Sequence, residues 1–136
     1  MKYVDSTELD TFAQGFSINA NSFKSWLKQW SIDKANKILE ETKNRTPVDT
    51  GKLLASWQEP KVELSGNVIV ITFENTAYYS GWVEYGHNKP YHAGEPQGGP
   101  NWVDGRFMIT VPLEDFISDV SAIFSANFVD YMLKKV

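Results

Sequence analysis

The sequence predicts an α+β fold, in which a small, mainly antiparallel sheet packs against two long amphipathic helices, with short helices connecting them. Three observations predict this class. Apolar residues recur at helical spacing in two long stretches, residues 21–44 and 113–133. Between these stretches lie short apolar-rich runs bounded by turn residues, which are typical of strands. A chain of 136 residues is within the usual size of one domain, so we expect a single domain over residues 1–136, with an N-terminal extension over 1–18.

Composition argues against several classes of protein. With 13 Lys and Arg against 17 Asp and Glu, the formal charge is −4 and both signs are scattered, which does not indicate sequence-specific nucleic-acid binding. The absence of cysteine removes disulfides and thiolate metal sites. The start of the chain contains Asp5, Glu8 and Asp10 and no unbroken apolar run, so it matches neither a signal peptide nor a membrane span. We expect a soluble protein made in a cytoplasm, without a membrane partner.

The first long helix is predicted over about residues 21–45. Its apolar positions follow helical spacing: Phe23, Trp26, Leu27, Trp30, Ile38 and Leu39. Pro47 stops this helix, because the residue before a proline is pushed out of the helical region. A second, short helix is predicted to start at Asp49 or Thr50, whose side-chain oxygens can accept the free amides of its first turn, and to continue through Trp57.

Gly51 and Lys52 follow this predicted cap and raise the question of a phosphate-binding loop. A Walker-type loop needs a glycine about five positions before its Gly-Lys pair and a Ser or Thr after it, because backbone amides hold the phosphate and the hydroxyl holds magnesium. This chain has Thr46 and Leu53 at those two positions. The stretch therefore favours a helix start over a phosphate site.

A β-hairpin is predicted over residues 59–75, where Ser65-Gly66-Asn67 separates two apolar-rich runs. In the first run Val62 and Leu64 alternate with charged residues, which indicates one solvated face. The second run is apolar on both faces of its strand: Val68 and Val70 on one, and Ile69, Ile71 and Phe73 on the other. Such a strand must be covered twice, so we expect helices on one face and another part of the chain or a neighbouring subunit on the other.

A short aromatic helix is predicted from Thr76, which can cap it, to Gly86, which ends it. It carries one carboxylate, Glu84, among aromatic and apolar residues. Residues 87–101 then contain three prolines and three glycines without periodicity. They predict a loop whose length is typical of functional loops.

The last part of the chain predicts a strand and a long helix. The alternation of Phe107, Ile109 and Val111 indicates a strand within residues 102–111. Pro112 suits the first turn of the helix that follows, over about residues 113–133. The apolar stripe of this helix consists of Leu113, Phe116, Ile117, Val120, Ile123, Phe124 and Phe128.

Three stretches of the chain together resemble a known family. They are Thr46-Pro47-Val48-Asp49-Thr50-Gly51-Lys52-Leu53 followed by Ser56, then Tyr78-Tyr79 through Val83-Glu84-Tyr85-Gly86, and last a loop ending in Arg106-Phe107-Met108 before a proline and a C-terminal helix. In this order and spacing, over about residues 20–133, they are similar to the tail-completion or neck proteins of long-tailed bacteriophages. The chain departs from the family pattern at His87, where a threonine is usual, and in its long Gly- and Pro-rich loop.

The resemblance implies a structural protein of the head-tail junction of a phage or prophage, without catalytic residues or cofactors. Such a protein is expected to form a homo-oligomeric ring that joins the tail to the head. Its other expected partners are the tail-tube or tail-terminator protein and the head-completion or connector protein. The resemblance places it in the virion, after synthesis in the cytoplasm of the bacterial host.

Ring subunits meet through heterologous interfaces, so we expect the aromatic segment, the two-faced strand and the long loop to form contact surfaces. Glu84 is predicted to pair with Arg106 or Lys52, and Asp49 to cap the second helix. The candidate interface residues are Tyr78, Tyr79, Trp82, Glu84, Tyr85, Tyr91 and Trp102. The residues expected to shape the fold are Pro47, Asp49, Thr50, Gly51, Gly86, Arg106 and Phe107.

A metal-site enzyme is one alternative interpretation. Two imidazoles and a carboxylate suit zinc, and the ligands would be His87, His92 and Glu95, with Glu84 or Asp104 in addition. Because a Gly- and Pro-rich loop does not fix the geometry of its side chains, two solvent-exposed loop histidines are the simpler interpretation.

A carbohydrate-binding module is the other alternative. Exposed rings of Tyr91 and Trp102 could stack on sugars, with the 87–101 loop framing the site. Against this function, two long amphipathic helices are unusual beside a sugar-binding sheet.

Overall fold

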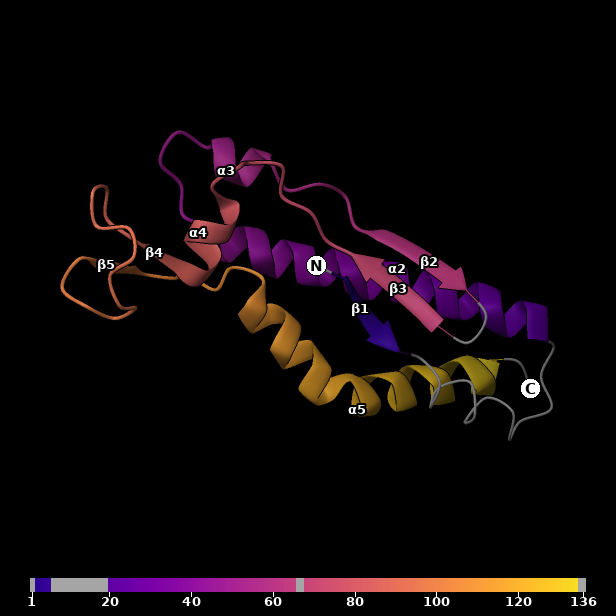
Figure 1. Ribbon diagram of the computed structural model, residues 1–136. Helices are drawn as coiled ribbons and strands as arrows, with labels where there is room; N and C mark the ends of the chain where they lie inside the picture. Colours follow the sequence, from indigo (N-terminus) through magenta and orange to yellow (C-terminus); the bar gives the residue numbers. More distant parts are fainter. Residues whose placement is uncertain (1, 6–19, 66–67, 135–136) are drawn as a thin grey trace.

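The computed structural model describes residues 2–5, 20–65 and 68–134 and confirms the predicted α+β class (Figure 1). Its elements, in chain order, are β1 (Lys2–Asp5), α2 (Ala20–Arg45), α3 (Lys52–Ala55), β2 (Lys61–Ser65), β3 (Val68–Thr72), α4 (Ser80–Tyr85), β4 (Gly86–Asn88), β5 (Trp102–Asp104) and α5 (Thr110–Lys134). Of the predicted N-terminal extension, residues 2–5 form β1, and the rest lies outside the described residues.

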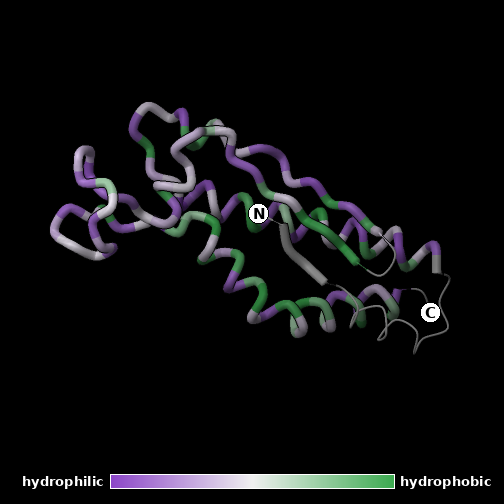
Figure 2. The backbone as a smooth tube through the Cα atoms, in the orientation of Figure 1, coloured by the Kyte–Doolittle hydropathy of each residue, from purple (hydrophilic) through white to green (hydrophobic). Residues whose placement is uncertain are grey.

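The two long helices run along the sheet. Figure 1 shows α2 along the length of the three-stranded sheet and α5 beside it, with α4 and the hairpin of β4 and β5 beyond one end of the sheet. Figure 2 shows that hydrophobic stretches concentrate in β3 and α5, and these pack with the buried face of α2, which supplies the largest share of the core. The arrangement leaves the β4 and β5 hairpin at the far end of the molecule, away from this core.

The sheet has the order β1-β3-β2, and both pairs are antiparallel, so β3 is its central strand. Leu64 pairs with Ile69 on the face that packs against the core. Ser65 pairs with Val68, which leaves two positions for the predicted turn; those two lie outside the described residues. Val68 is 37% exposed on the opposite face. The described residues thus cover one face of β3 fully and leave the other partly open.

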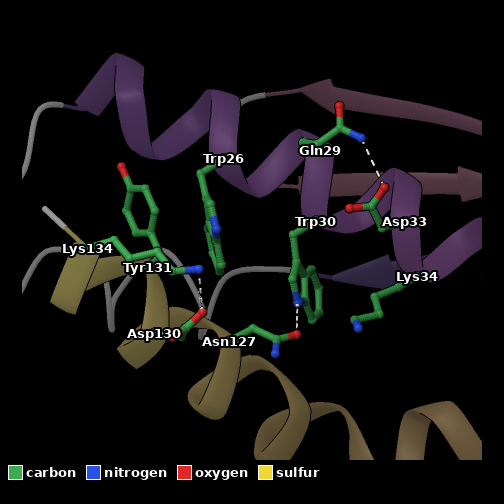
Figure 3. A pocket seen from close by; sticks show the side chains of 9 residues that line it. All are labelled: Trp26, Gln29, Trp30, Asp33, Lys34, Asn127, Asp130, Tyr131 and Lys134. Carbon is green, nitrogen blue, oxygen red and sulfur yellow. Dashed lines mark hydrogen bonds and ion pairs between the residues drawn. The ribbon is translucent and has the colours of Figure 1, made fainter.

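Aromatic rings hold α2 against α5. The Trp26 ring stacks on Tyr131 with their centroids 5.0 Å apart, and the Trp30 ring meets Phe124 edge to face at 5.3 Å. Trp30 Nε1 also donates a 2.9 Å hydrogen bond to Asn127 Oδ1 (Figure 3). These contacts confirm most of the apolar faces predicted for both helices, because rings spaced one turn apart on each helix interlock across the seam. Ile117, which was predicted to belong to the apolar stripe of α5, is instead 41% exposed.

α3 begins at Lys52, later than predicted, and the predicted Asp49 cap is wrong. The cap position is Gly51, with a φ of 83°, and no side-chain hydrogen bond caps the helix. Glycine suits this position because side chains with a Cβ rarely adopt a positive φ. Thr50 Oγ1 does accept a 3.3 Å hydrogen bond from the Lys52 amide, so the hydroxyl supports the turn from outside the helix.

α4 ends at Gly86 as predicted, with a φ of 91° at that glycine, but it begins at Ser80 rather than near Thr76. The Thr76 hydroxyl donates to Ser56 O at 3.4 Å instead of capping α4. His87 and Asn88, which were predicted within the long loop, form β4 and pair with β5.

The strand predicted through Phe107, Ile109 and Val111 does not form, since β5 ends at Asp104. The chain turns sharply at Phe107, which has a φ of 48°, and α5 begins at Thr110. Met108 and Ile109, which are adjacent in the sequence, are both buried, whereas Phe107 is 41% exposed, so burial does not alternate as it would in a strand. Pro112 lies in the first turn of α5, as predicted.

Removing the Phe128 ring should destabilise the fold strongly, because this side chain is fully buried between α2 and α5. We expect Phe128→Ala to lower the free energy of unfolding by about 3–5 kcal/mol. The neighbouring Val129 is exposed, so Val129→Ala should change it by less than about 0.5 kcal/mol. Urea denaturation followed by tryptophan fluorescence measures both, and equal losses would contradict the assigned core.

Candidate functional site

One buried carboxylate, Glu84, joins α4 to the start of α5. Glu84 is only 4% exposed. Both carboxylate oxygens accept the Ile109 amide at 3.1 Å, and Oε2 also accepts the amide and the hydroxyl of Thr110 at 3.2 Å each. Amides at a helix N-terminus lack partners within the helix, and the helix dipole favours a negative charge there. Glu84 therefore caps α5 from a distant part of the chain.

Glu84 pairs with neither Arg106 nor Lys52, contrary to the prediction, since the ion pairs found among the described residues join other groups. Arg106 contributes its backbone instead: its amide donates to Val83 O at 2.7 Å, and the Phe107 amide donates to Glu84 O at 3.1 Å. The burial of Glu84 places this predicted interface residue inside the chain.

Two glycines let these segments approach each other closely. A Cβ built on Gly86 would lie 2.5 Å from the Trp102 ring and 2.7 Å from Val103 O. A Cβ on Gly105 would collide with the backbone of Glu84. The end of α4 and the segment after β5 thus form one contact of backbone against backbone, which only glycine permits at these two places.

The turn between α2 and α3 packs against the same region, which is formed by α4, the segment after β5 and the start of α5. Trp57 Nε1 donates a 2.9 Å hydrogen bond to the buried Thr46 Oγ1, which in turn donates to Thr42 O at 2.8 Å. Arg45 Nε donates to Phe107 O at 3.2 Å. The three stretches on which the family resemblance rests therefore converge at one end of the molecule, although they are far apart in the sequence.

An aromatic surface covers the outside of this region. Tyr78 is 82% exposed and Trp82 is 58% exposed, and their rings meet edge to face with centroids 6.2 Å apart. Tyr85 is also exposed, whereas Tyr79 is half-buried. Residues 76–83 contain no charged side chain. Exposed rings with few charges among them are typical of protein interfaces, and Tyr78, Trp82 and Tyr85 are referred to below as the aromatic surface.

A hairpin arm, residues 86–104, extends beyond α4 (Figure 1). Its base is the antiparallel pair of β4 and β5. Tyr91, in the loop between the two strands, is fully exposed and has a φ of 71°. Trp102, predicted to act with Tyr91, lies half-buried at the base, with its ring against Gly86.

Glu95 ties the loop of the arm together. Its Oε1 accepts a 2.7 Å hydrogen bond from His92 Nδ1, and its Oε2 accepts one of 2.8 Å from Asn101 Nδ2. Its backbone oxygen accepts a third bond, of 3.1 Å, from Asn88 Nδ2. The bond from Asn101, and then that from His92, hold the pKa of Glu95 below its ordinary value of 4.5. The predicted loop is thus cross-linked at its centre by one carboxylate.

Residues 11–86, more than half of the chain, match the model of the family described as "Bacteriophage HK97-gp10, putative tail-component". The chain belongs to this HK97-gp10-like family. The protein is therefore grouped with the structural components of phage tails, as the family resemblance implied. The matched region includes α2, α3 and α4 and ends at Gly86, where the arm begins. No curated protein and no solved structure matched the chain.

The two histidines of the chain bond to different partners. His92 Nδ1 bonds to Glu95, whereas His87 Nδ1 lies 3.4 Å from Trp82 O. Within the described ranges, no three His, Asp or Glu side chains gather as a metal site would require. Glu84, a further ligand in that interpretation, is occupied as the cap of α5. The described structure therefore offers this alternative no assembled donor set.

A pocket of about 410 Å³ lies between the long helices (Figure 3). The rings of Trp26 and Trp30 line it together with polar residues of both helices. Several of these polar groups are already paired: Gln29 with Asp33 at 3.0 Å, and Lys134 with Asp130 at 3.0 Å. The pocket lies at the end of the helix seam and has no polar group set apart for a ligand by these contacts. Among the described residues, neither long helix has the unbroken apolar length that a bilayer crossing requires.

Removing the Glu84 carboxylate should destabilise the protein, because it leaves the Ile109 and Thr110 amides without an acceptor. We expect Glu84→Ala to lower the free energy of unfolding by about 3 kcal/mol and Glu84→Gln by about 1 kcal/mol, since the amide oxygen can still accept. The exposed Glu59 serves as the control, and Glu59→Ala should be neutral within about 0.5 kcal/mol. Urea denaturation measures all three.

The order of the arm should depend on pH through Glu95. A carboxyl group with a lowered pKa in the folded state stabilises that state fully above its unfolded pKa, and this contribution is lost as the pH falls through the folded pKa. We expect exchange of the arm amides to rise below about pH 4.5, after correction for intrinsic exchange. Glu95→Gln should remove this dependence. A wild-type arm with flat protection down to global unfolding would refute the role of Glu95.

Proposed function

We propose that this HK97-gp10-like protein is a tail-completion or neck component, which assembles into a homo-oligomeric ring at the head-tail junction and joins the tail to the head. The ring would contact the tail-tube or tail-terminator protein on one side and the head-completion or connector protein on the other. In this role the protein acts by binding and has no catalytic residue. Membership of a family of phage tail components supports the proposal.

The observation that carries the proposal is the aromatic surface. Tyr78, Trp82 and Tyr85 expose large rings on a helical turn that Glu84 fixes to the body of the protein. Tyrosine and tryptophan bury a large area on binding and lose few rotamers, so they are common anchors of interfaces. A rigid, charge-poor surface of this kind supports a stable contact between subunits.

The second face of β3 supports the proposal in a different way. Val68 is exposed there, on the side of the sheet that the described helices do not cover. A subunit contact would supply the second cover expected for a strand that is apolar on both faces.

Light scattering across a concentration series, with negative-stain images, tests the assembly. We expect a discrete ring for the wild type, formed alone or after addition of tail-tube or head-completion protein. Trp82→Ala should weaken self-association about thirtyfold, as loss of an interface hot spot of about 2 kcal/mol would, with little change in monomer stability. Purified wild-type protein that stays monomeric alone and after addition of each partner protein would overturn the proposal.

A further inference from the structure

We propose that the arm of one copy docks on a second copy of the chain, where the Tyr91 ring enters the pocket beside Val48. This inference rests on the proposed ring and identifies the two surfaces that meet in it. The pocket, referred to below as the Val48 pocket, has a volume of about 350 Å³. Its lining consists of Pro47, Val48, Asp49, Thr50, Gly51, Leu53, Tyr79 and Val83.

The arm is preformed for such docking. Tyr91 is fully exposed, and the three hydrogen bonds of Glu95 hold the loop that carries it. The positive φ of Tyr91, 71°, is uncommon for a residue with a side chain, and it persists only where the surrounding structure enforces it. Because the loop is already ordered, docking of the ring does not have to order it, which favours binding.

The Val48 pocket matches the two ends of a tyrosine side chain. Pro47, Val48 and Val83 give it apolar walls, and Val48 is 65% exposed although it is apolar. Asp49 and Thr50 line the same pocket and carry oxygens that can accept a hydrogen bond from a phenol. A tyrosine suits such a site because its ring is apolar and its tip is polar.

Three other pockets of the described structure have more charged residues in their lining. One of them, of about 300 Å³ beside α4, is lined by Glu74 and Glu84. The pocket between α2 and α5 is lined by Asp33, Lys34, Asp130 and Lys134. A second groove along the same helices is lined by Lys34, Lys37, Glu41, Asp115 and Asp119. The Val48 pocket has a single charged residue, Asp49. Covering charged groups with a ring costs free energy unless they gain partners, so the Val48 pocket is the favoured acceptor.

The arm and the Val48 pocket are different surfaces of one chain, so the contact is heterologous. Each copy would give its arm to one neighbour and its pocket to the other. Repetition of such a contact closes into a ring when the rotation between copies allows it. The turn that forms the pocket thereby gains a role in assembly in addition to its role as a helix start.

Cross-linking between single-cysteine variants tests the contact, because the chain has no cysteine of its own. Ala93→Cys places a thiol on the arm and leaves Tyr91 intact, and Lys52→Cys places one next to the Val48 pocket; both positions are exposed. A mixture of the two variants, treated with a short bismaleimide, should give covalent dimers. Ser125→Cys, at an exposed position of α5, is the matched control partner and should give at least tenfold fewer dimers with Ala93→Cys.

Two further variants sharpen the test. Addition of Tyr91→Ala to the Ala93→Cys chain should abolish the cross-link to Lys52→Cys. The double variant Ala93→Cys/Lys52→Cys should give a ladder of covalent multimers, whereas a contact of two equivalent surfaces would stop at dimers. Rings of wild-type size without the cross-link, a cross-link that survives Tyr91→Ala, or a product that stops at dimers would each overturn the docking of Tyr91. Wild-type protein without any assembly would instead refute the proposed ring, and is read from its mass before any cross-linking.

Discussion

The fold of this tail component depends on the bond between the Glu84 carboxylate and the first amides of α5. α5 carries Phe124 and Phe128 against α2, so the point where α5 begins decides how these rings meet the rings of α2. The same α4 that supplies the carboxylate holds Trp82 outward. The short helix α4 thus contributes both to the position of the core helix α5 and to the exposed aromatic surface.

The sequence predicted the long helices and the β2 and β3 hairpin correctly, because their apolar periods extend over many residues or are bounded by clear turn residues. It failed where a contact joins distant segments. Glu84 was predicted to form an ion pair, whereas it caps the start of α5. A capping side chain is normally sought next to the helix start, but Ile109, at the start of α5, has no side-chain oxygen. The alternation of Phe107 and Ile109 indicated a strand, yet a tight turn at Phe107 exposes that ring and buries the adjacent Met108 and Ile109. Glu95 was considered only as a metal ligand, since no local pattern marks a residue whose carboxylate gathers two donors and whose backbone oxygen accepts a third.

The aromatic residues of the chain divide into two sets with different surroundings. Trp26 and Trp30 lie in the seam between α2 and α5, where long helices on both sides cover them. Tyr78 and Trp82 lie on and beside a helix of six residues, which is too short to cover its own outer face. Composition and spacing could not separate these sets, because both follow helical periods. The two sets are separated instead by the length of the helix that carries the rings, and by the Glu84 side chain, which points inward to the start of α5.

The sheet has a strand at its edge that resists pairing with another chain. β2 bonds to β3 on one side only, and its exposed face carries Lys61 and Glu63. Charged side chains on an edge strand oppose the addition of a further strand, since pairing would strip part of their water. The β2 edge is therefore a poor site for backbone pairing between copies of this chain. The assembly proposed above would then use side-chain surfaces, whose fixed angles can stop growth at a defined number of subunits.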